Sequence, residues 1–251
     1  MDTKLTHNYY LQKKLIIMKN FDKNINLFRK VLSTQLDDKL TNKIKKEVRQ
    51  EYESLLPNIP FIGGDKNRLT KNLIDTTIAL AFSKVMKRYD YSTEEIAFFL
   101  FEIMKETFNS IPKVKKFLIR SLMFLLLTFP FNIFHRKIIK RFAKKSQMGI
   151  YSDNFMFYFI KGEGKEFDFG IDYTACPISK FWREQGVEEI SPYICLYDYY
   201  SGEMTGTGLV RTMTLAEGFE KCDFRFKRGR NPQNKQRTQI ITRDTLNKEF
   251  S

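Results

Sequence analysis

Apolar residues follow a helical period in the first part of the chain. In LDDKLTNKIKKEVRQEYESLL (36–56) they recur every four positions, at Leu36, Leu40, Ile44, Val48 and Tyr52. This spacing predicts one amphipathic helix with a basic polar face. Two prolines and two glycines in the following LPNIPFIGGDKN end the helix.

Two more helices are predicted, from about Leu69 to Arg88 and from Ser92 to about Asn109. Ser92 and Glu95 have the spacing of a capping box. After Pro112 an apolar stretch lies between two basic clusters, and its uninterrupted apolar run covers only 122–127. A membrane span needs about 20 predominantly apolar residues. We therefore expect a buried helix pair that breaks near Pro130, with an interfacial helix on anionic lipid as the alternative.

The apolar period changes to two after residue 150. The segment NFMFYFIKGEGKEFDFGIDYT (154–174) predicts two strands around a glycine-containing turn. In the second of these strands an aromatic or aliphatic residue alternates with Asp168, Gly170 and Asp172. GLVRTMTLA and KCDFRFK predict two more strands, joined around Glu217 and Gly218, and two short helices lie between the strand pairs.

The predicted fold class is therefore α+β, with an N-terminal helical region followed by a small antiparallel sheet with short helices. Residues 1–150 carry 29 Lys and Arg against 14 Asp and Glu, or +15, while residues 151–251 carry 14 against 15, or −1. We expect a basic helical region at 1–148, an α+β region at 149–230 and a mobile tail at 231–251.

The chain has three cysteines, and its N-terminal part offers only a four-residue apolar run at 15–18. Such a run is shorter than the apolar core of a secretory signal. We expect a cytoplasmic protein whose thiols stay reduced.

Two cysteines lie near predicted helix starts. In TACPISKFWREQG, Pro177 occupies the first helical position and Gly186 the stop, so Cys176 is the N-cap, where backbone amides favour a thiolate. In SPYICLYDYYSG, Cys195 lies one turn into a helix that Gly202 would end, and Asp198 shares its face.

The third cysteine, Cys222, opens the strand KCDFRFK. It shares a face with two phenylalanines, whereas Asp223 and Arg225 lie on the other face. Arg211 lies inside a strand, where a guanidinium needs an anionic partner. Each thiol has a simpler explanation, since cysteine is often a buried structural residue.

These segments resemble the L-2-amino-thiazoline-4-carboxylic acid hydrolase family of bacterial proteins. The resemblance rests on FDFGIDYTACPISKFWREQG, ISPYICLYDYY, GTGLVRTMTLAEG and KCDFRFKRG, in this order, and it extends over about 45–230. The matching positions are Cys176, Cys195, Asp198, Arg211, Cys222, Asp223 and Arg225.

The resemblance implies a hydrolase that opens a C–N or C–S bond of a cyclic amidine-like small molecule and releases an N-carbamoyl amino acid. The expected catalytic residues are Cys176, Cys222, Cys195, Asp198 and Asp223. Substrate binding is expected of Arg211, Arg225 and Asp172. A Cys-His dyad is not expected, because the two histidines, His7 and His135, lie outside the segments that carry the motifs.

Two alternatives stay open. The three cysteines are also candidate ligands for zinc or iron, although no C-x-x-C spacing is present. The basic helical part is alternatively a module that binds a membrane surface or a protein partner, with 112–145 as the contact with anionic membrane. Nucleic acid is not an expected partner, because no recognition motif accompanies the lysines.

Overall fold

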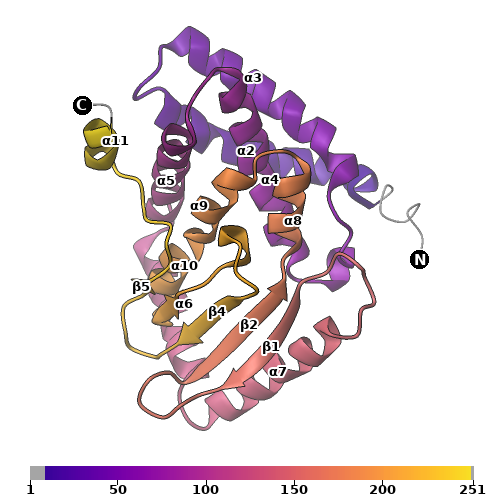
Figure 1. Ribbon diagram of the computed structural model, residues 1–251, viewed down its shortest axis with the longest axis vertical. Helices are drawn as coiled ribbons and strands as arrows, with labels where there is room; N and C mark the ends of the chain where they lie inside the picture. Colours follow the sequence, from indigo (N-terminus) through magenta and orange to yellow (C-terminus); the bar gives the residue numbers. More distant parts are fainter. Residues whose placement is uncertain (1–8, 250–251) are drawn as a thin grey trace. The chain divides into compact units, whose positions relative to one another are not determined.

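The computed structural model describes residues 9–249 (Figure 1). The chain forms two compact units. Unit 1 comprises Met1–Thr107, Pro177–Ser191 and Ile240–Ser251, and unit 2 comprises Phe108–Cys176 and Pro192–Gln239. The predicted regions 1–148 and 149–230 have different boundaries, because helices near residues 110–146 belong with the sheet.

Unit 1 is helical. Its longer helices are α2 (Lys14–Leu32), α3 (Asp38–Leu55), α4 (Thr70–Arg88) and α5 (Thr93–Asn109), the last of which extends two residues past the unit. Its shorter helices are η1 (Leu56–Asn58), η2 (Gly64–Lys66), α8 (Pro177–Glu184), η3 (Glu188–Ile190) and α11 (Arg243–Glu249).

The apolar stripe of α3 lies in the core of unit 1. Ile44, Val48 and Tyr52 are fully buried, and the Tyr52 ring stacks on Phe21 of α2 at 4.8 Å. Burying such side chains is the main stabilising contribution to a helical unit of this kind. The four-residue period therefore predicted both the helix and the face that it buries.

The predicted start of α5 is confirmed in detail. The Ser92 backbone amide donates to the Glu95 carboxylate at 2.8 Å, and the Glu95 amide donates to Ser92 Oγ at 3.2 Å. This reciprocal pair is the capping box that the sequence predicted. Helix α8 begins at Pro177, and Gly186 beyond its end has a φ of +71°, which agrees with the predicted start and stop.

Unit 2 is built around a five-stranded sheet in the order β1-β2-β4-β3-β5. The strands are β1 (Met156–Lys161), β2 (Phe169–Ala175), β3 (Leu209–Arg211), β4 (Cys222–Phe226) and β5 (Gln233–Asn234). All neighbours are antiparallel except β3 and β5, which are parallel. The α+β class and the largely antiparallel sheet are confirmed.

Helices cover part of this sheet and carry the connection between β2 and β3. Helix α7 (Phe131–Ser146) packs against β1, and α10 (Tyr197–Thr205) packs against β3 and α6 (Lys113–Leu126). The turn η4 (Leu215–Glu217) leads into Gly218, whose φ of +85° explains the predicted turn between β3 and β4.

The predicted single helix after Ser191 is wrong. The chain forms α9 (Ser191–Cys195), breaks at Leu196 and continues as α10 (Tyr197–Thr205). Gly202 lies inside α10, where a Cβ would stand 3.3 Å from Leu209 and Pro232. Glycine is needed there for close packing, and the helix ends instead at Gly206, whose φ is +68°.

The expectation of a buried helix pair after Pro112 is half right. The pair breaks near Pro130, as predicted, between α6 and α7. However, α6 has no buried residue, and α7 buries only Ala143 and Ser146. The sequence shows apolar residues on more than one side of each helix. It does not predict which of these sides pack against other elements.

The expectation of a mobile tail from residue 231 does not fit its first part. Gln233 and Asn234 form β5 beside β3, and Gln236 is only 2% exposed. Polar residues such as Gln236 are ordered here by hydrogen bonds rather than by apolar burial, which is why the low apolar content of the segment was misleading.

Candidate functional site

The three thiols occupy the ends of separate elements of unit 2. Cys176 directly follows β2 and precedes Pro177, Cys195 is the last residue of α9, and Cys222 is the first residue of β4. Cys222 is paired with Tyr173 across the β2–β4 ladder. Because β2 and β4 are antiparallel neighbours, the C-terminal end of β2 and the N-terminal end of β4 lie at the same end of the sheet. Cys176 and Cys222 therefore lie at that end.

The pKa of the Cys195 thiol depends on the groups around it, including the other two thiols. Burial raises the pKa of the Cys195 thiol well above its ordinary value, the Arg211 guanidinium lowers it, and Cys176, Cys222 and Asp198 raise it further. Coulombic effects of this kind need proximity. These effects agree with the geometry, in which Cys176 and Cys222 lie at the same end of β2 and β4 and Arg211 donates a hydrogen bond to the Cys195 carbonyl. We call Cys176, Cys195 and Cys222 the thiol cluster.

Cys222 is the buried member of the thiol cluster, with 7% of its surface exposed. Its pKa is raised, first by burial, while an amide hydrogen bond from Leu215 to Sγ at 3.2 Å and the charge of Arg211 partly offset this. Cys176 and Cys195 are half-buried as residues, although the Cys195 thiol itself is buried, since burial is the main cause of its raised pKa. The thiols therefore differ in their access to solvent and in their cost of ionisation.

Arg211 supplies the positive charge beside the thiols. Its side chain is 1% exposed, and Nη1 donates to Asp198 Oδ2 at 2.7 Å, Nη2 to the Cys195 carbonyl at 2.6 Å and Nε to Gln236 Oε1 at 3.0 Å. The guanidinium also lies 4.7 Å from the centroid of the Phe224 ring. These contacts satisfy the predicted need for an anionic partner and fix the charge in place.

Asp198 comes from the first turn of α10, so the helix break at Leu196 places it next to Arg211. Its side chain is 42% exposed, in contrast to that of Arg211. Tyr199, the next residue, donates its hydroxyl to the Arg211 carbonyl at 3.2 Å and to Gln236 Oε1 at 3.3 Å. Burial raises the pKa of Tyr199 to about 12.

Two residues near the thiol cluster were missed as functional candidates. Tyr173 pairs with Cys222 and lies on the same face of the sheet; burial raises its pKa, and Asp198, Cys176 and Cys222 raise it further. Gln236 contacts Arg211 and Tyr199, yet its buried Nε2 has no hydrogen-bond partner. The pairing of Tyr173 with Cys222 follows from the strand register. No pattern in the sequence predicts that Gln236 contacts Arg211 and Tyr199.

Asp172 and Arg225 lie on the opposite face of the sheet from Cys222. Strand alternation separates them, because Asp172 precedes Tyr173 in β2 and Arg225 lies three residues after Cys222 in β4. Asp172 accepts from Arg225 Nη1 at 2.6 Å and from Lys221 Nζ at 2.8 Å. The structure therefore does not bring these two predicted substrate-binding residues to the thiols.

Asp223 is also on that opposite face and has a different set of contacts. It is 7% exposed and accepts hydrogen bonds from the Thr212 amide at 2.9 Å, the Thr212 hydroxyl at 2.6 Å and the Met213 amide at 2.7 Å. A carboxylate with this many donors is well suited to holding the end of β3 against β4. Its negative charge also raises the pKa of the adjacent Cys222 thiol, although its side chain lies on the other face of the sheet.

The described residues give no support to a zinc or iron site. Within 9–249, no group of three or more His, Cys, Asp or Glu side chains could hold a metal ion. The ring centroids of His135, in α7, and Phe169 lie 5.8 Å apart. Phe169 pairs with Phe226, which lies four residues, or about 13 Å, along β4 from Cys222. His135 is therefore next to the end of the strands away from Cys222. His7 lies outside the described residues.

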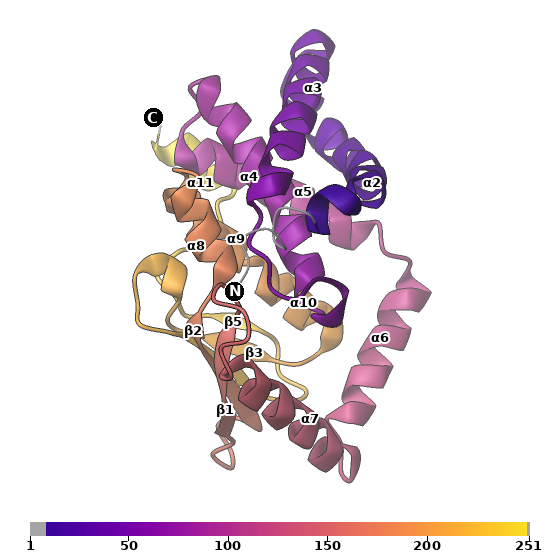
Figure 2. The ribbon, with the colours of Figure 1, turned by 90° about the vertical axis from the view of Figure 1, so that its right-hand side faces the viewer.

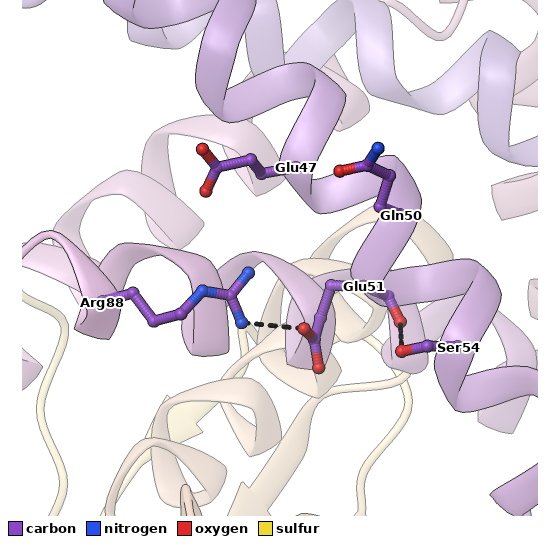
Figure 3. Close-up of a pocket in the computed structure, with 5 residues that line it drawn as sticks. All are labelled: Glu47, Gln50, Glu51, Ser54 and Arg88. Atoms are coloured by element: carbon purple, nitrogen blue, oxygen red, sulfur yellow. Dashed lines mark hydrogen bonds and ion pairs between the residues drawn. The ribbon is translucent and has the colours of Figure 1, made fainter.

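A surface hollow in unit 1 contains none of the candidates. Glu47, Gln50, Glu51, Ser54 and Arg88 line it (Figure 3). Glu51 accepts ion pairs from Arg88 at 2.8 Å and from Lys84 at 2.9 Å. These internal pairs join α3 to α4 and explain the polar lining.

A comparison with protein families identifies the region that contains the thiol cluster. The family described as L-2-amino-thiazoline-4-carboxylic acid hydrolase matches residues 72–226, which is more than half of the chain. The chain belongs to this family. Its match includes all three cysteines, Asp198 and Arg211, and it ends before Gln236. Searches of curated proteins and of solved structures found no match.

The family name implies hydrolase activity. The segment that the family shares runs from α4 to the end of β4, so it contains both short helices and the β2–β4 pair that carry the thiols. Within the described residues no single helix is long and apolar enough to cross a membrane, although α6 and α7 together, bent by 90°, have sufficient length and composition.

Proposed function

We propose that the thiol cluster hydrolyses a cyclic amidine-like small molecule related to 2-amino-thiazoline-4-carboxylate. The observation that carries this proposal is the thiol cluster, two of whose members lie beside the buried guanidinium of Arg211, inside the segment that the hydrolase family shares. A cationic, largely enclosed setting favours thiolate chemistry and the binding of an anionic substrate. Reduced thiols of this kind suit a cytoplasmic protein.

Cys176 is our candidate for the nucleophile. Burial raises the pKa of Cys195 and of Cys222, so both are expected to be protonated at neutral pH. Cys176 is half-buried and immediately precedes α8, which begins at Pro177. The positive end of a helix dipole favours a negative charge at that position.

In the proposed reaction the Cys176 thiolate adds to the carbon between the ring nitrogen and the ring sulfur. The ring nitrogen takes a proton, the bond from this carbon to the ring sulfur breaks, and the sulfur leaves with the electron pair. Water then adds to the same carbon, and the carbon–sulfur bond to Cys176 breaks, which regenerates the thiolate. The net change is the addition of one water, and the product is an N-carbamoyl amino acid.

Two charged residues have distinct roles in this scheme. The charge of Arg211 lowers the pKa of Cys195 and of Cys222, and the same guanidinium is our candidate for binding the substrate carboxylate. Asp198, which is partly exposed and within the same neighbourhood, is our candidate for moving a proton to the leaving group.

The first test measures which thiol reacts. Limiting iodoacetamide near pH 6.5 is expected to alkylate Cys176 before Cys195 and Cys222, as read by peptide mapping, because only a thiolate reacts at a useful rate. Cys176→Ser should abolish the formation of N-carbamoyl cysteine from 2-amino-thiazoline-4-carboxylate.

The exposed Thr174→Ser change in β2 is the matched control and should leave both results unchanged. If another thiol is alkylated first, or if Cys176→Ser keeps full activity, Cys176 is not the nucleophile. If the unaltered protein leaves this substrate and related cyclic amidines intact, the proposed reaction itself is wrong.

A further inference from the structure

Large apolar side chains are exposed around the bend between α6 and α7. Those that lie within 122–134 are Leu122 at 57% exposure, Phe124 at 58%, Leu125 at 47%, Phe129 at 73%, Phe131 at 48%, Ile133 at 48% and Phe134 at 63%. The first two turns of α6 add Val114, Phe117 and Leu118. Contiguous exposed apolar surface in a folded unit indicates an interaction site.

The spacing on α6 shows that this exposure follows a helical face. Val114, Phe117, Leu118, Leu122 and Leu125 follow the i, i+3, i+4 rule and form one outward stripe. The other side of the helix packs against α10. The outward stripe is therefore additional to the surface that α6 needs for its own packing.

The charges around this apolar surface have one sign. Residues 113–145 include ten Lys and Arg and no Asp or Glu, and none of the ten lies between Arg120 and Arg136. An uncharged apolar bend is thus bordered by cations on both helices. We call residues 113–146 the basic hairpin; Figure 2 shows its two helices meeting at the bend.

We propose that the basic hairpin binds the surface of an anionic lipid bilayer. The bend inserts its phenylalanines below the headgroups, while the lysines and arginines on either side contact lipid phosphates. The two helices are bent by 90° and each is too short to cross the bilayer alone, so the proposal places the basic hairpin in the interface rather than across the bilayer.

Other occupants fit this surface less well. A second copy would bring ten cations against ten, with no carboxylate in the basic hairpin to neutralise them. Nucleic acid would neutralise the cations, but the exposed phenylalanines at the bend would gain little from a phosphate backbone. A lipid interface offers an apolar layer and an anionic layer together.

The rest of unit 2 holds the basic hairpin in position. Arg228, after β4, donates from Nη1 to Thr128 Oγ1 at 2.7 Å, and its guanidinium lies 5.2 Å from the Phe124 ring. At the other end of the hairpin, the Phe157 amide of β1 donates to Ser146 Oγ at 3.1 Å. The apolar bend is therefore presented by a fixed scaffold, which lowers the entropic cost of binding.

The test uses the full chain in a vesicle flotation assay. Vesicles of phosphatidylcholine with about 30% phosphatidylglycerol are expected to bind the protein at about 0.05 M salt, and binding should weaken at about 0.5 M. Vesicles of phosphatidylcholine alone should bind at least about tenfold less, because each basic residue near an anionic surface contributes roughly fivefold.

Two variants separate the apolar and electrostatic contributions. Phe129→Ser with Phe134→Ser should lower the affinity by more than about tenfold while leaving the far-UV circular dichroism unchanged, because both side chains are exposed. Lys137→Glu with Lys144→Glu lowers the net charge of the basic hairpin from +10 to +6 and should weaken the preference for anionic lipid by more than about tenfold. Leu15→Ser with Ile16→Ser, at exposed positions of α2, is the matched control and should bind as the unaltered protein does.

Four outcomes would overturn the proposal. Two are equal binding to neutral and anionic vesicles and unchanged binding by the phenylalanine variant. A dimer in light scattering that both variants disrupt would assign the surface to a second copy of the chain. Salt-sensitive binding to duplex DNA without vesicle binding would assign it to nucleic acid. None of these outcomes depends on hydrolase activity.

Discussion

Arg211 introduces a full positive charge into an almost closed environment, and its partners determine what that charge does. Asp198 is the ionic partner of Arg211 and also raises the pKa of Cys195 and Cys222. The same carboxylate thus holds the guanidinium and opposes ionisation of the thiols. A neutral side chain at this position should separate these two effects.

We expect Asp198→Asn to lower the pKa of Cys195 and of Cys222, because a negative charge near both thiols is removed. Alkylation of these thiols by iodoacetamide should then become faster at any pH below their pKa values. Asp198 is 42% exposed, but the Arg211 side chain is only 1% exposed, so the loss of its ionic partner should cost about 3 kcal/mol in the free energy of unfolding.

Rates measured by peptide mapping from pH 7 to 10 check this expectation. The exposed Asp38→Asn change in unit 1 should leave all alkylation rates as they are. Slower alkylation of Cys195 in Asp198→Asn would mean that the loss of Arg211 positioning outweighs the loss of negative charge.

At the scale of elements, the short strand β5 has an effect beyond its two residues. By pairing with β3, it brings Gln236 to Arg211 and Tyr199. Removal of 232–251 is therefore expected to destabilise unit 2, although the sequence predicts a mobile tail at 231–251. Its polar side chains are part of the hydrogen-bond network around the thiol cluster.

Gln236→Met is expected to lower the free energy of unfolding by about 1–3 kcal/mol, because Arg211 Nε and the Tyr199 hydroxyl lose their buried acceptor. The loss of the unpartnered Nε2 offsets part of this cost. Urea unfolding measures the change. Gln233→Met, at an exposed position of β5, should have less than about 0.5 kcal/mol of effect, and equal effects of the two changes would remove Gln236 from its assigned role.

The elements that the sequence predicted well are those with local causes. The Ser92–Glu95 capping box and the Pro177 helix start depend on residues only a few positions apart, so their geometry can be read from spacing. The position of Gln236 and the exposure of α6 depend on which distant elements pack together. In the candidate site, the proximity of Cys176 and Cys222 could be predicted because both lie at strand ends. The separation of Arg225 from these thiols could be recognised only from the strand register in the structure.

The whole molecule distributes its titratable groups unevenly. All three cysteines belong to unit 2, and the pKa values of Cys195 and Cys222 are raised. In the unfolded chain these thiols ionise near pH 8.5, whereas the folded unit keeps them protonated. The folded state then binds more protons than the unfolded state, so the stability of unit 2 is full below pH 8.5 and falls as the pH rises.

We expect the urea concentration at the unfolding midpoint of unit 2 to decrease as the pH is raised from about 8.5 to 10. In Cys195→Ala with Cys222→Ala, the midpoint should depend less on pH. The unfolding of unit 1, which contains no cysteine, is the internal control. The change of its urea midpoint with pH should be the same with and without the two cysteine substitutions. An identical pH dependence of unit 2 with and without the two thiols would show that other groups, such as the buried tyrosines, dominate.

The chain passes between the two units four times, at 107, 176, 191 and 239. During synthesis, residues 1–107 therefore leave the ribosome without the segments that complete unit 1, and the edge of the sheet in unit 2 stays unpaired until Gln233 and Asn234 have emerged. Domains usually fold one after another from the N-terminus. Here the nascent chain must keep two partly built units open at once, and its lysine-rich early segments must stay soluble while they wait for their later partners.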